Sequence, residues 1–368
     1  MSEHNYTTPN ARKPVADPSL FRPDWTAGIP RDPKLLWLDK NENTDPELLK
    51  FNAQILSEVD PKAVYSYPEL TPLYNKLAGR LAVKSNNLIF TAGSDGAIRS
   101  VFEAFIDPGD VVVHTVPTFA MYSVYSKMYG ARVMPLNYRS TDEGPILPIE
   151  EVIDTISQTR PKLVCLPNPD SPTGTVFNPG DMRRIIEVAG QSGALILIDE
   201  AYYPFYDQTV VPWIEEYDHL VVTRTFAKAW GVSGLRIGYA VSCPEIARLL
   251  HKVRPMYEVN TLAVAMVEKL LDHEDMMIAS VRRLNAGRDK FLERMSALKL
   301  RTVITHGNFL HVEFGKYTEA VHKKLRNIVL YRLDGGEPLK GYSRFSATTE
   351  ECFEPVIKAI EEAIAEMC

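Results

Sequence analysis

The chain has 368 residues, 45% of them hydrophobic, and a formal net charge of −6 at pH 7. A chain of this length and apolar content can bury a large core, and it is more typical of two domains than of one. Its acidic balance excludes nucleic acid and anionic membranes as main partners, because neither is attracted to such a surface, and favours a small-molecule ligand.

Residues 1 to about 35 are rich in proline and charge, which favours an extended arm over a packed element. The chain has no basic start followed by an apolar segment and no run of eighteen apolar residues, so we expect neither a secretion signal nor a membrane span. The four cysteines follow no CxxC or metal-ligand spacing, so neither a disulfide framework nor a metal site is indicated. These features predict a cytoplasmic protein.

A short strand over residues 35–39 runs into the polar stretch Lys40-Asn-Glu-Asn43. Two asparagines and a glutamate at a strand exit form either a turn or a polar patch that faces a ligand, and the residues alone favour the turn. A helix over 46–59 follows, then a loop that contains Tyr67, then a helix over 73–81 with leucines on one face.

The strand over residues 88–93 ends in glycine, and the next helix begins with Ser94 and Asp95 and continues to residue 105. A strand-to-helix turn of this kind presents free N–H groups at the positive end of the helix, which is an anion site. Capping of the helix by either side chain explains the same residues equally well.

Two further strand exits carry candidate ligand residues. The strand over 110–114 leads to Phe119 at the start of a helix, where the ring either presents a flat face to an aromatic ligand or packs in the core. The strand over 162–167 leads to Asn168-Pro-Asp-Ser171-Pro-Thr-Gly174, which must be a loop because two prolines and a glycine break helix and strand. The other elements in this part are a strand over 132–138 and helices over 148–159 and 179–192.

The apolar strand over residues 194–198 ends in Asp199, and Tyr202 follows closely. Ligands of an open parallel sheet bind at the carboxyl ends of its strands. A buried aspartate that pairs with a pyridinium nitrogen keeps this nitrogen protonated, so that the ring withdraws electrons. Tyr202 is close enough in the chain to hydrogen-bond a hydroxyl group of the same ring.

The strand over residues 219–223 leads through Thr225 to Lys228, and Arg236 lies eight positions further on. Such a lysine is either an exposed loop residue, which is the common case, or a side chain that forms a Schiff base with a carbonyl substrate or with pyridoxal phosphate. Arg236 and the hydroxyl of Thr225 are suited to a phosphate group. All of these candidates lie at strand exits, and unrelated residues would scatter over both ends of the strands.

Strands alternate with helices from residue 88 to residue 239, which predicts a mostly parallel sheet covered by helices on both faces. We predict three parts: an N-terminal arm over 1–45 that joins the small domain, a large domain over 46–245 and a C-terminal small domain over 246–368.

The small domain is predicted to be α+β. Its expected elements are helices over 244–253, 261–271, 278–298, 328–333 and 353–367 and strands over 301–305, 309–314 and 342–346. Arg344 interrupts the last, otherwise apolar strand. This arginine either faces solvent or clamps a substrate carboxylate with two hydrogen bonds.

The order of these motifs, from Leu38-Asp-Lys-Asn-Glu-Asn43 to Arg344-Phe-Ser-Ala-Thr-Thr-Glu350, resembles that of fold-type-I pyridoxal-phosphate aminotransferases of class I/II, in particular the histidinol-phosphate aminotransferase branch. The resemblance covers nearly the whole chain, and the motifs are specific as an ordered set. It implies a fold-type-I α/β transferase, in which a large domain with a mostly parallel central sheet binds the cofactor and a smaller α+β domain follows. It also implies a homodimer.

The resemblance further implies roles for the candidate residues. Lys228 would hold pyridoxal 5'-phosphate as an internal aldimine and later move a proton between the substrate Cα and the cofactor. Asp199 would bind the ring nitrogen, Tyr202 the ring oxygen, and Phe119 would stack on the ring. The cofactor phosphate would be surrounded by Ser94, Asp95, Thr225 and Arg236.

Other matched positions concern the substrate and the dimer. By the same match, Asn168 and Ser171 belong to the cofactor-binding loop. Tyr67 would reach across the dimer interface to the cofactor phosphate of the neighbouring subunit. Arg344 would clamp the substrate carboxylate, and Asn43 would lie near the substrate.

The chain departs from the family pattern at a few positions. The family usually reads Asn-Pro-Asn-Asn-Pro-Thr-Gly in the loop, so Ser171 stands where an asparagine normally donates to the ring oxygen. Ala227 replaces the serine that usually precedes the lysine, which removes a phosphate hydrogen bond worth about 1.5–3 kcal/mol. Ser66 precedes Tyr67 where an arginine is common.

These departures leave two enzymatic functions open. The first is an aminotransferase that acts on an L-amino acid. The second is a lyase or cyclase with the same cofactor, which eliminates, decarboxylates or cyclises a modified amino acid such as a hydroxy-arginine, as in capreomycidine-synthase-like relatives. A non-enzymatic regulator would need a DNA-binding module, and the chain has no spare segment or basic patch for one.

Overall fold

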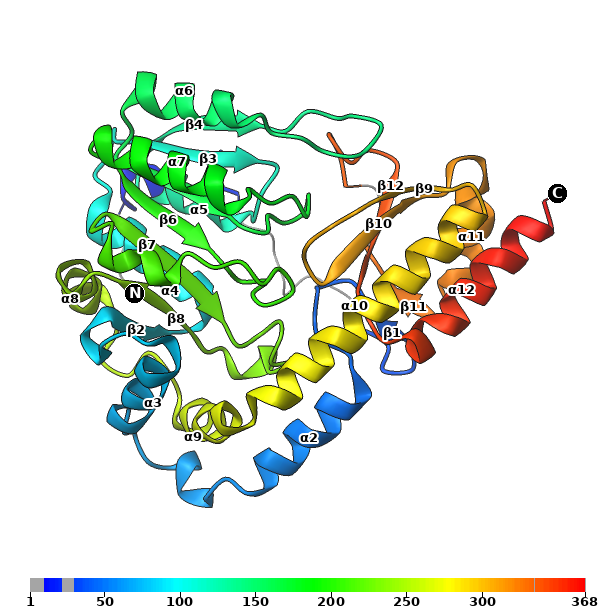
Figure 1. Ribbon diagram of the computed structural model, residues 1–368, viewed down its shortest axis with the longest axis horizontal. Helices are drawn as coiled ribbons and strands as arrows, with labels where there is room; N and C mark the ends of the chain where they lie inside the picture. Colours follow the sequence, from blue (N-terminus) through cyan, green and yellow to red (C-terminus); the bar gives the residue numbers. More distant parts are fainter. Residues whose placement is uncertain (1–9, 22–29, 334, 368) are drawn as a thin grey trace, which may run out of the picture.

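The computed structural model describes residues 10–21, 30–333 and 335–367. Its central feature is a seven-stranded sheet in which β8 runs antiparallel to both of its neighbours and the other pairs are parallel (Figure 1). This is the mostly parallel sheet that the sequence predicts. The strands in spatial order are β2 (Leu88–Thr91), β8 (Gly238–Ser242), β7 (Leu220–Thr225), β6 (Leu195–Asp199), β5 (Leu163–Pro167), β3 (Val111–Val116) and β4 (Arg132–Asn137).

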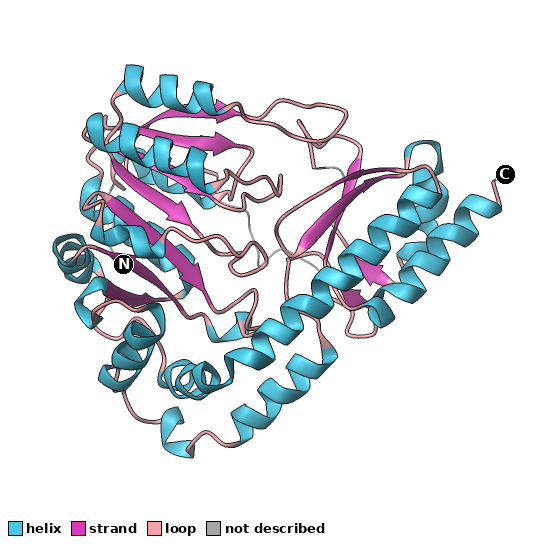
Figure 2. Cartoon of the chain, in the orientation of Figure 1, coloured by secondary structure: helices cyan, strands magenta, loops and turns pink. Residues whose placement is uncertain are grey.

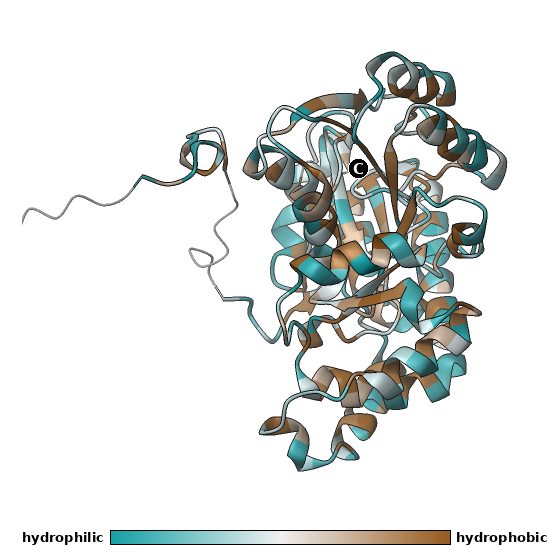
Figure 3. Ribbon diagram, turned by 90° about the vertical axis from the view of Figure 1, so that its left-hand side faces the viewer, coloured by the Kyte–Doolittle hydropathy of each residue, from teal (hydrophilic) through white to brown (hydrophobic). Residues whose placement is uncertain are grey.

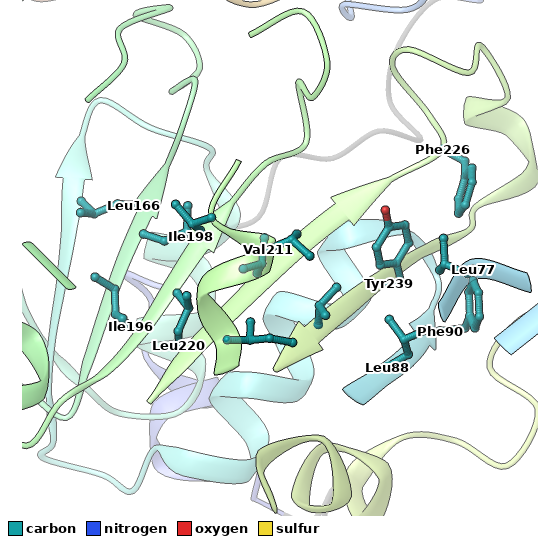
Figure 4. Close-up of a cluster of buried hydrophobic side chains, with 14 of the residues drawn as sticks. Leu77, Leu88, Phe90, Leu166, Ile196, Ile198, Val211, Leu220, Phe226 and Tyr239 are labelled. Carbon is teal, nitrogen blue, oxygen red and sulfur yellow. The ribbon is translucent and has the colours of Figure 1, made fainter. Parts of the chain in front are cut away.

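Both faces of this sheet are buried, because alternate residues of its strands enter two different apolar clusters. On β5, for example, Leu163 and Cys165 belong to one cluster and Val164 and Leu166 to the other. Figure 4 shows part of the second cluster. The first cluster is covered by α4 (Gly93–Phe105), α5 (Met121–Met128) and α8 (Pro244–Val253). The second is covered by α2 (Pro46–Ser57), α3 (Thr71–Leu81), α6 (Ile149–Thr159), α7 (Pro179–Gln191) and α9 (Thr261–Leu270).

A second, antiparallel sheet lies beside the carboxyl edge of the large one (Figures 1 and 2). It consists of β12 (Tyr342–Ser346), β10 (Phe309–Glu313) and β9 (Arg301–Val303), and α10 (Glu274–Ala297), α11 (Thr318–Leu325) and α12 (Glu350–Ala365) pack around it. A short parallel pair joins β1 (Leu36–Trp37) to β11 (Val329–Leu330). Smaller elements are α1 (Lys13–Ala16) and 3-10 turns at Pro61–Val64, Ser85–Asn87, Val211–Glu215, Ser233–Leu235, Leu271–His273 and Gly315–Tyr317.

The structure corrects one predicted element. The segment over residues 328–333, expected as a helix, contains the strand β11, and the helix of this region is α11, which the sequence analysis did not predict. A short apolar run fits helix and strand equally well, and here the pairing of Leu36 with Val329 decides it. The proposed division at residues 45 and 245 remains a prediction, and residues 1–9 and 22–29 of the proposed arm lie outside the described part of the chain.

Hydropathy agrees with this layering. In Figure 3 the strands inside the molecule are mostly brown, whereas the helices mix brown and teal, as expected of elements that bury one face only. Among the described helices, none combines the length and the apolar character needed to cross a membrane.

The long helix α10 is held against the start of α12 at a glycine. A Cβ atom on Gly287 would overlap the carbonyl oxygen of Thr348, next to Thr349, whose side chain caps α12. The backbones of the two segments therefore meet without a side chain between them. Thr348 directly follows β12, the strand of Arg344. The contact therefore fixes this strand relative to α10, the helix that spans both halves of the molecule.

Gly287→Ala tests this contact. We expect it to lower the free energy of unfolding by about 1–3 kcal/mol, because overpacking outweighs the helix propensity that alanine adds. The matched control is Gly79→Ala in α3, where the new methyl group meets no atom within 4 Å. The control should stabilise the protein by about 0.5–1 kcal/mol. Urea unfolding measures both, and equal effects of the two substitutions would contradict the proposed contact.

Candidate active site

A cavity of about 420 Å³ opens at the carboxyl ends of β5, β6 and β7. In Figure 1 the arrowheads of β6 and β7 point from the large sheet toward the smaller one. The predicted residues that line the cavity are Ser94, Asp95, Phe119, Ser171, Asp199, Tyr202, Thr225, Lys228 and Arg236. These residues come from separate strand exits, so the parallel sheet brings them together as predicted.

Asp199 lies at the buried end of β6, where its carboxylate accepts hydrogen bonds from the hydroxyls of Tyr122 (3.1 Å) and Thr223 (3.0 Å). The side chain forms no ion pair with any residue that the structure describes, and burial raises its pKa to about 6. A buried carboxylate without a cation is destabilised, and a positively charged ring nitrogen would supply the missing partner. This site therefore fits the pyridinium nitrogen of pyridoxal phosphate.

Lys228 follows β7, and its ammonium group donates a hydrogen bond to the carbonyl of Lys40 at 3.0 Å. Burial lowers the pKa of Lys228, and the positive charges of Arg344 and Arg236 lower it further. No carboxylate of the described residues lies within ion-pair distance of its Nζ atom. A lysine in such surroundings is more readily neutral, which is the form that attacks an aldehyde.

The amino end of α4 forms an anion site. The N–H of Ala92 at the N-cap position donates to Glu258 at 3.2 Å, but neither Ser94 nor Asp95 caps this helix, so the next N–H groups have no side-chain cap. Gly93 has a φ angle of +77°, and a Cβ atom there would come within 2.8 Å of the Arg236 guanidinium. Arg236 forms no ion pair with a described residue. The helix end and this arginine together fit the cofactor phosphate.

Two aromatic residues flank the space between these groups. Phe119 is 39% exposed, so it is not a core residue, and its ring meets Tyr122 edge-on at 6.2 Å. This leaves one of its faces available for stacking on a planar ligand. Tyr202 accepts a hydrogen bond on its hydroxyl from Asn41 at 2.8 Å.

The loop that carries Ser171 is anchored by Asp170. Its buried carboxylate accepts hydrogen bonds from the hydroxyls of Thr115 (2.6 Å), Thr118 (2.9 Å) and Tyr138 (2.9 Å). Burial raises the pKa of Asp170 to about 7, although these hydroxyls act against the rise. The three donors hold the loop at the cavity wall, where Ser171 lies.

Asn43 and Asn168 do not line the cavity, and their roles near the substrate and the cofactor stay predictions. The amide of Asn43 donates to the carbonyl of Ala229 and the hydroxyl of Ser280, both at 3.0 Å. Asn168 binds both main-chain polar groups of Phe177. Both side chains thus hold main chain near the cavity, and their amides are no longer free for a ligand.

Tyr67 and Arg344 also lie outside the cavity wall. Tyr67 is 72% exposed and stacks on Tyr257 at 4.2 Å, so it is not directed at the cavity of its own chain. The Nη2 atom of Arg344 donates to the carbonyl of Asp39 at 3.1 Å. The charge of Arg344 nevertheless reaches Lys228.

Sequence reasoning missed several residues of the site. Tyr122 and Thr223 bind the Asp199 carboxylate. In the stretch from Lys40 to Asn43, Glu42 lines the cavity and Asn43 does not. Tyr122 lies one helical turn after Phe119, and Thr223 ends the apolar run before Lys228. These positions in the sequence could have indicated that both residues lie near the site.

Comparisons with known proteins support this reading of the geometry. The family described as "Aminotransferase class I and II" matches residues 33–360. The chain is 31% identical to the histidinol-phosphate aminotransferase of Caldanaerobacter subterraneus subsp. tengcongensis over 89% of this chain and 93% of that protein.

Solved structures share the fold. The histidinol-phosphate aminotransferase of Sinorhizobium meliloti, in complex with pyridoxal-5'-phosphate, superposes with a TM-score of 0.75 at 23% identity and covers 90% of this chain and 91% of its own. The L-threonine-O-3-phosphate decarboxylase of Porphyromonas gingivalis superposes with a TM-score of 0.74 at 21% identity, with 90% and 100% covered. From the family match and the site geometry, we conclude that the chain belongs to the aminotransferase class I and II family and is a pyridoxal-phosphate-dependent enzyme.

Proposed function

We propose that the protein transfers the amino group of L-histidinol phosphate to a 2-oxo acid. The observation that carries this proposal is a pair of arginines, Arg332 and Arg344, that both bind the carbonyl of Asp39, next to the residue Lys40 of the cavity wall. The similarity to a curated histidinol-phosphate aminotransferase over most of both chains supports it. The shared fold alone cannot choose the reaction, because a decarboxylase has it as well.

The two arginines form an isolated β-bridge, and each main-chain N–H donates to the carbonyl of the other (2.9 and 2.8 Å). Their guanidinium groups converge, since Nε of Arg332 and Nη2 of Arg344 both donate to the carbonyl of Asp39 at 3.1 Å. Neither forms an ion pair with a described carboxylate. Two guanidinium groups that share a single neutral acceptor suit a dianionic phosphate, and L-histidinol phosphate carries a phosphate ester where an amino acid carries its carboxylate.

In this proposal the residues of the cavity have separate roles in the reaction. When bound, pyridoxal phosphate supplies an aldehyde that condenses with amines and a ring that withdraws electrons from the substrate Cα. Lys228 holds the cofactor and moves the proton at that Cα, for which its lowered pKa is suited. Asp199 keeps the ring nitrogen protonated. Arg236, Ser94 and the end of α4 hold the phosphate of the cofactor.

We also propose a homodimer. Tyr67 and Tyr257 stack on each other at the surface, and Val64, Tyr65 and Met256 nearby in the chain are also largely exposed. Apolar side chains gathered in this way are typical of surfaces that another protein covers. A second copy would bury them and would bring Tyr67 toward the neighbouring cavity.

A coupled assay tests the main proposal. Protein loaded with pyridoxal phosphate should convert L-histidinol phosphate and 2-oxoglutarate into glutamate and 3-(imidazol-4-yl)-2-oxopropyl phosphate. Lys228→Ala should lower kcat by at least about 10²-fold, because the proton carrier is gone. Borohydride reduction of the wild type, followed by peptide mass spectrometry, should place the cofactor on Lys228. Release of carbon dioxide or of an elimination product, without glutamate, would favour the lyase or cyclase alternative.

The arginine pair predicts a difference between substrates. Arg332→Gln should raise the KM for L-histidinol phosphate by about 10- to 100-fold, the effect of losing a hydrogen bond to a charged group. The KM for 2-oxoglutarate should change little, because one guanidinium suffices for a carboxylate. Arg344→Gln should raise both KM values. Arg326→Gln, which removes an exposed charge after α11, is the control. Equal effects of Arg332→Gln on the two substrates would contradict the assignment of the phosphate to this pair.

Asp199→Asn should separate stability from activity. In the cofactor-free protein, the folded pKa of Asp199 is about 6, above its ordinary value of 3.8, so the folded state binds the proton more tightly than the unfolded state and stability falls as pH rises from about 4 to 6. The substitution removes this penalty and should stabilise the cofactor-free protein by about 1–3 kcal/mol at pH 7, with no gain at pH 4. Turnover should fall by at least about 10²-fold. Urea unfolding at the two pH values provides the measurement, and a loss of stability at pH 7 would refute the argument.

A further inference from the structure

Two buried polar atoms without hydrogen-bond partners lie on neighbouring strands of the small sheet. His311 on β10 and Arg344 on β12 are directly opposite each other in the antiparallel register, so their side chains leave the same face of the sheet. The Nδ1 atom of His311 and the Nε atom of Arg344 are both buried, and neither has a hydrogen-bond partner. Such atoms are rare in folded proteins, and each needs an explanation.

The unpaired atom of His311 is a hydrogen-bond acceptor. The Nε2 atom lies 2.7 Å from the carbonyl of Pro172, and a carbonyl can only accept, so Nε2 carries the hydrogen. Burial lowers the pKa of His311 to about 3, which keeps the ring neutral near pH 7. Nδ1 therefore presents a lone pair in a direction fixed by the Pro172 contact.

The unpaired atom of Arg344 is a donor. Its Nη2 atom already donates to the carbonyl of Asp39. The Nε–H group of Arg344 has no acceptor. The Arg344 side chain is nevertheless close enough to His311 for its positive charge to lower the pKa of the imidazole. A donor and an acceptor without partners thus belong to directly opposite residues on the same face of the sheet.

We propose that His311 is a positioning residue for Arg344: when an anionic substrate group binds the guanidinium, Nε–H of Arg344 donates to Nδ1 of His311. This inference rests on the proposed role of Arg344 in substrate binding. The substrate draws the guanidinium away from the Asp39 carbonyl, and the ring then fixes its orientation. The Nε–H group of Arg344 and the Nδ1 atom of His311 therefore form their hydrogen bond only when the substrate is bound.

The same ring connects the substrate clamp to the cavity wall. Through Pro172, His311 contacts the loop that carries Ser171. The turn between β9 and β10 supports this loop as well, because His306 N–H donates to the carbonyl of Gly174 at 3.0 Å. Orientation of Arg344 and position of the loop are therefore coupled through one side chain.

A second unpaired acceptor belongs to a residue that binds the strand of Arg344. The Oδ1 atom of Asn41 is also buried without a partner. The amide nitrogen of this residue is held by the hydroxyl of Tyr202, and its backbone N–H donates to Ser346, two residues beyond Arg344. Asn41 is therefore fixed toward Tyr202, whereas His311 is the direct cross-strand neighbour of Arg344. The geometry favours His311.

Two substitutions separate the two nitrogens of the ring. His311→Gln keeps an N–H group at the position of Nε2 and loses the acceptor, whereas His311→Asn keeps an acceptor at the position of Nδ1 and loses the bond to Pro172. We expect His311→Gln to raise the KM for 2-oxoglutarate about tenfold, the effect of one hydrogen bond, with kcat changed less than about twofold. His311→Asn should keep a KM near the wild-type value. A purely structural role predicts the reverse order, because only His311→Asn releases the loop, and that order would overturn the proposal.

A double-mutant cycle completes the test. In an Arg344→Gln background, His311→Gln should add no further increase in KM, because its effect passes through Arg344. The control is His251→Gln, since that ring also contacts a main-chain carbonyl, of Leu88, on the far edge of the large sheet. If Arg344→Gln leaves the KM unchanged, the proposed role of Arg344 in substrate binding fails. If it raises the KM and His311→Gln does not, only this inference fails. Urea midpoints of all variants check folding.

Discussion

The chemistry proposed for the cavity depends on a carboxylate that has no ion-pair partner among the described residues, that of Asp199 at the end of β6. Its neighbour Glu200 shows the alternative, because Arg224 binds that carboxylate at 2.8 Å and lies 3.6 Å above the ring of Tyr203. Two adjacent acidic residues thus have opposite surroundings: Glu200 is neutralised by the protein, and Asp199 is provided only with hydroxyl and amide donors. The interaction that Asp199 lacks is the one a protonated ring nitrogen makes.

The rest of the cavity is arranged around that carboxylate. Arg236 lines the cavity near the amino end of α4, and Arg344 lies outside the cavity wall. The charges of both arginines disfavour the ammonium form of Lys228. In the proposed function, the same charges would bind two anionic groups and also favour the neutral amine of Lys228.

The sequence predicted the sheet and most of the cavity because strand ends can be recognised from apolar runs, and parallel strands bring their ends to one edge. It did not predict which partners the polar side chains of the loops bind. The amide of Asn43 binds the carbonyl of Ala229, 186 residues away, and that of Asn168 binds the main chain of Phe177, nine residues away. Glu42, which lines the cavity and pairs with Arg31, was not singled out because its partner lies outside the local motif. The segment around Val329 was assigned to a helix because its strand partner lies almost 300 residues earlier in the chain.

That distant pairing has a consequence for the order in which the molecule forms. During synthesis the segment that contains Lys40 and Glu42 emerges early, but β1 has no partner until the residues of β11 have left the ribosome. The strands of the large sheet, which precede residue 243, are all available before then. The lysine and the acids of the sheet can therefore be in place while one wall of the cavity is still missing. The segment that follows β1 and contributes Lys40 and Glu42 to the cavity wall is therefore held by strand pairing only after residue 330 has been made.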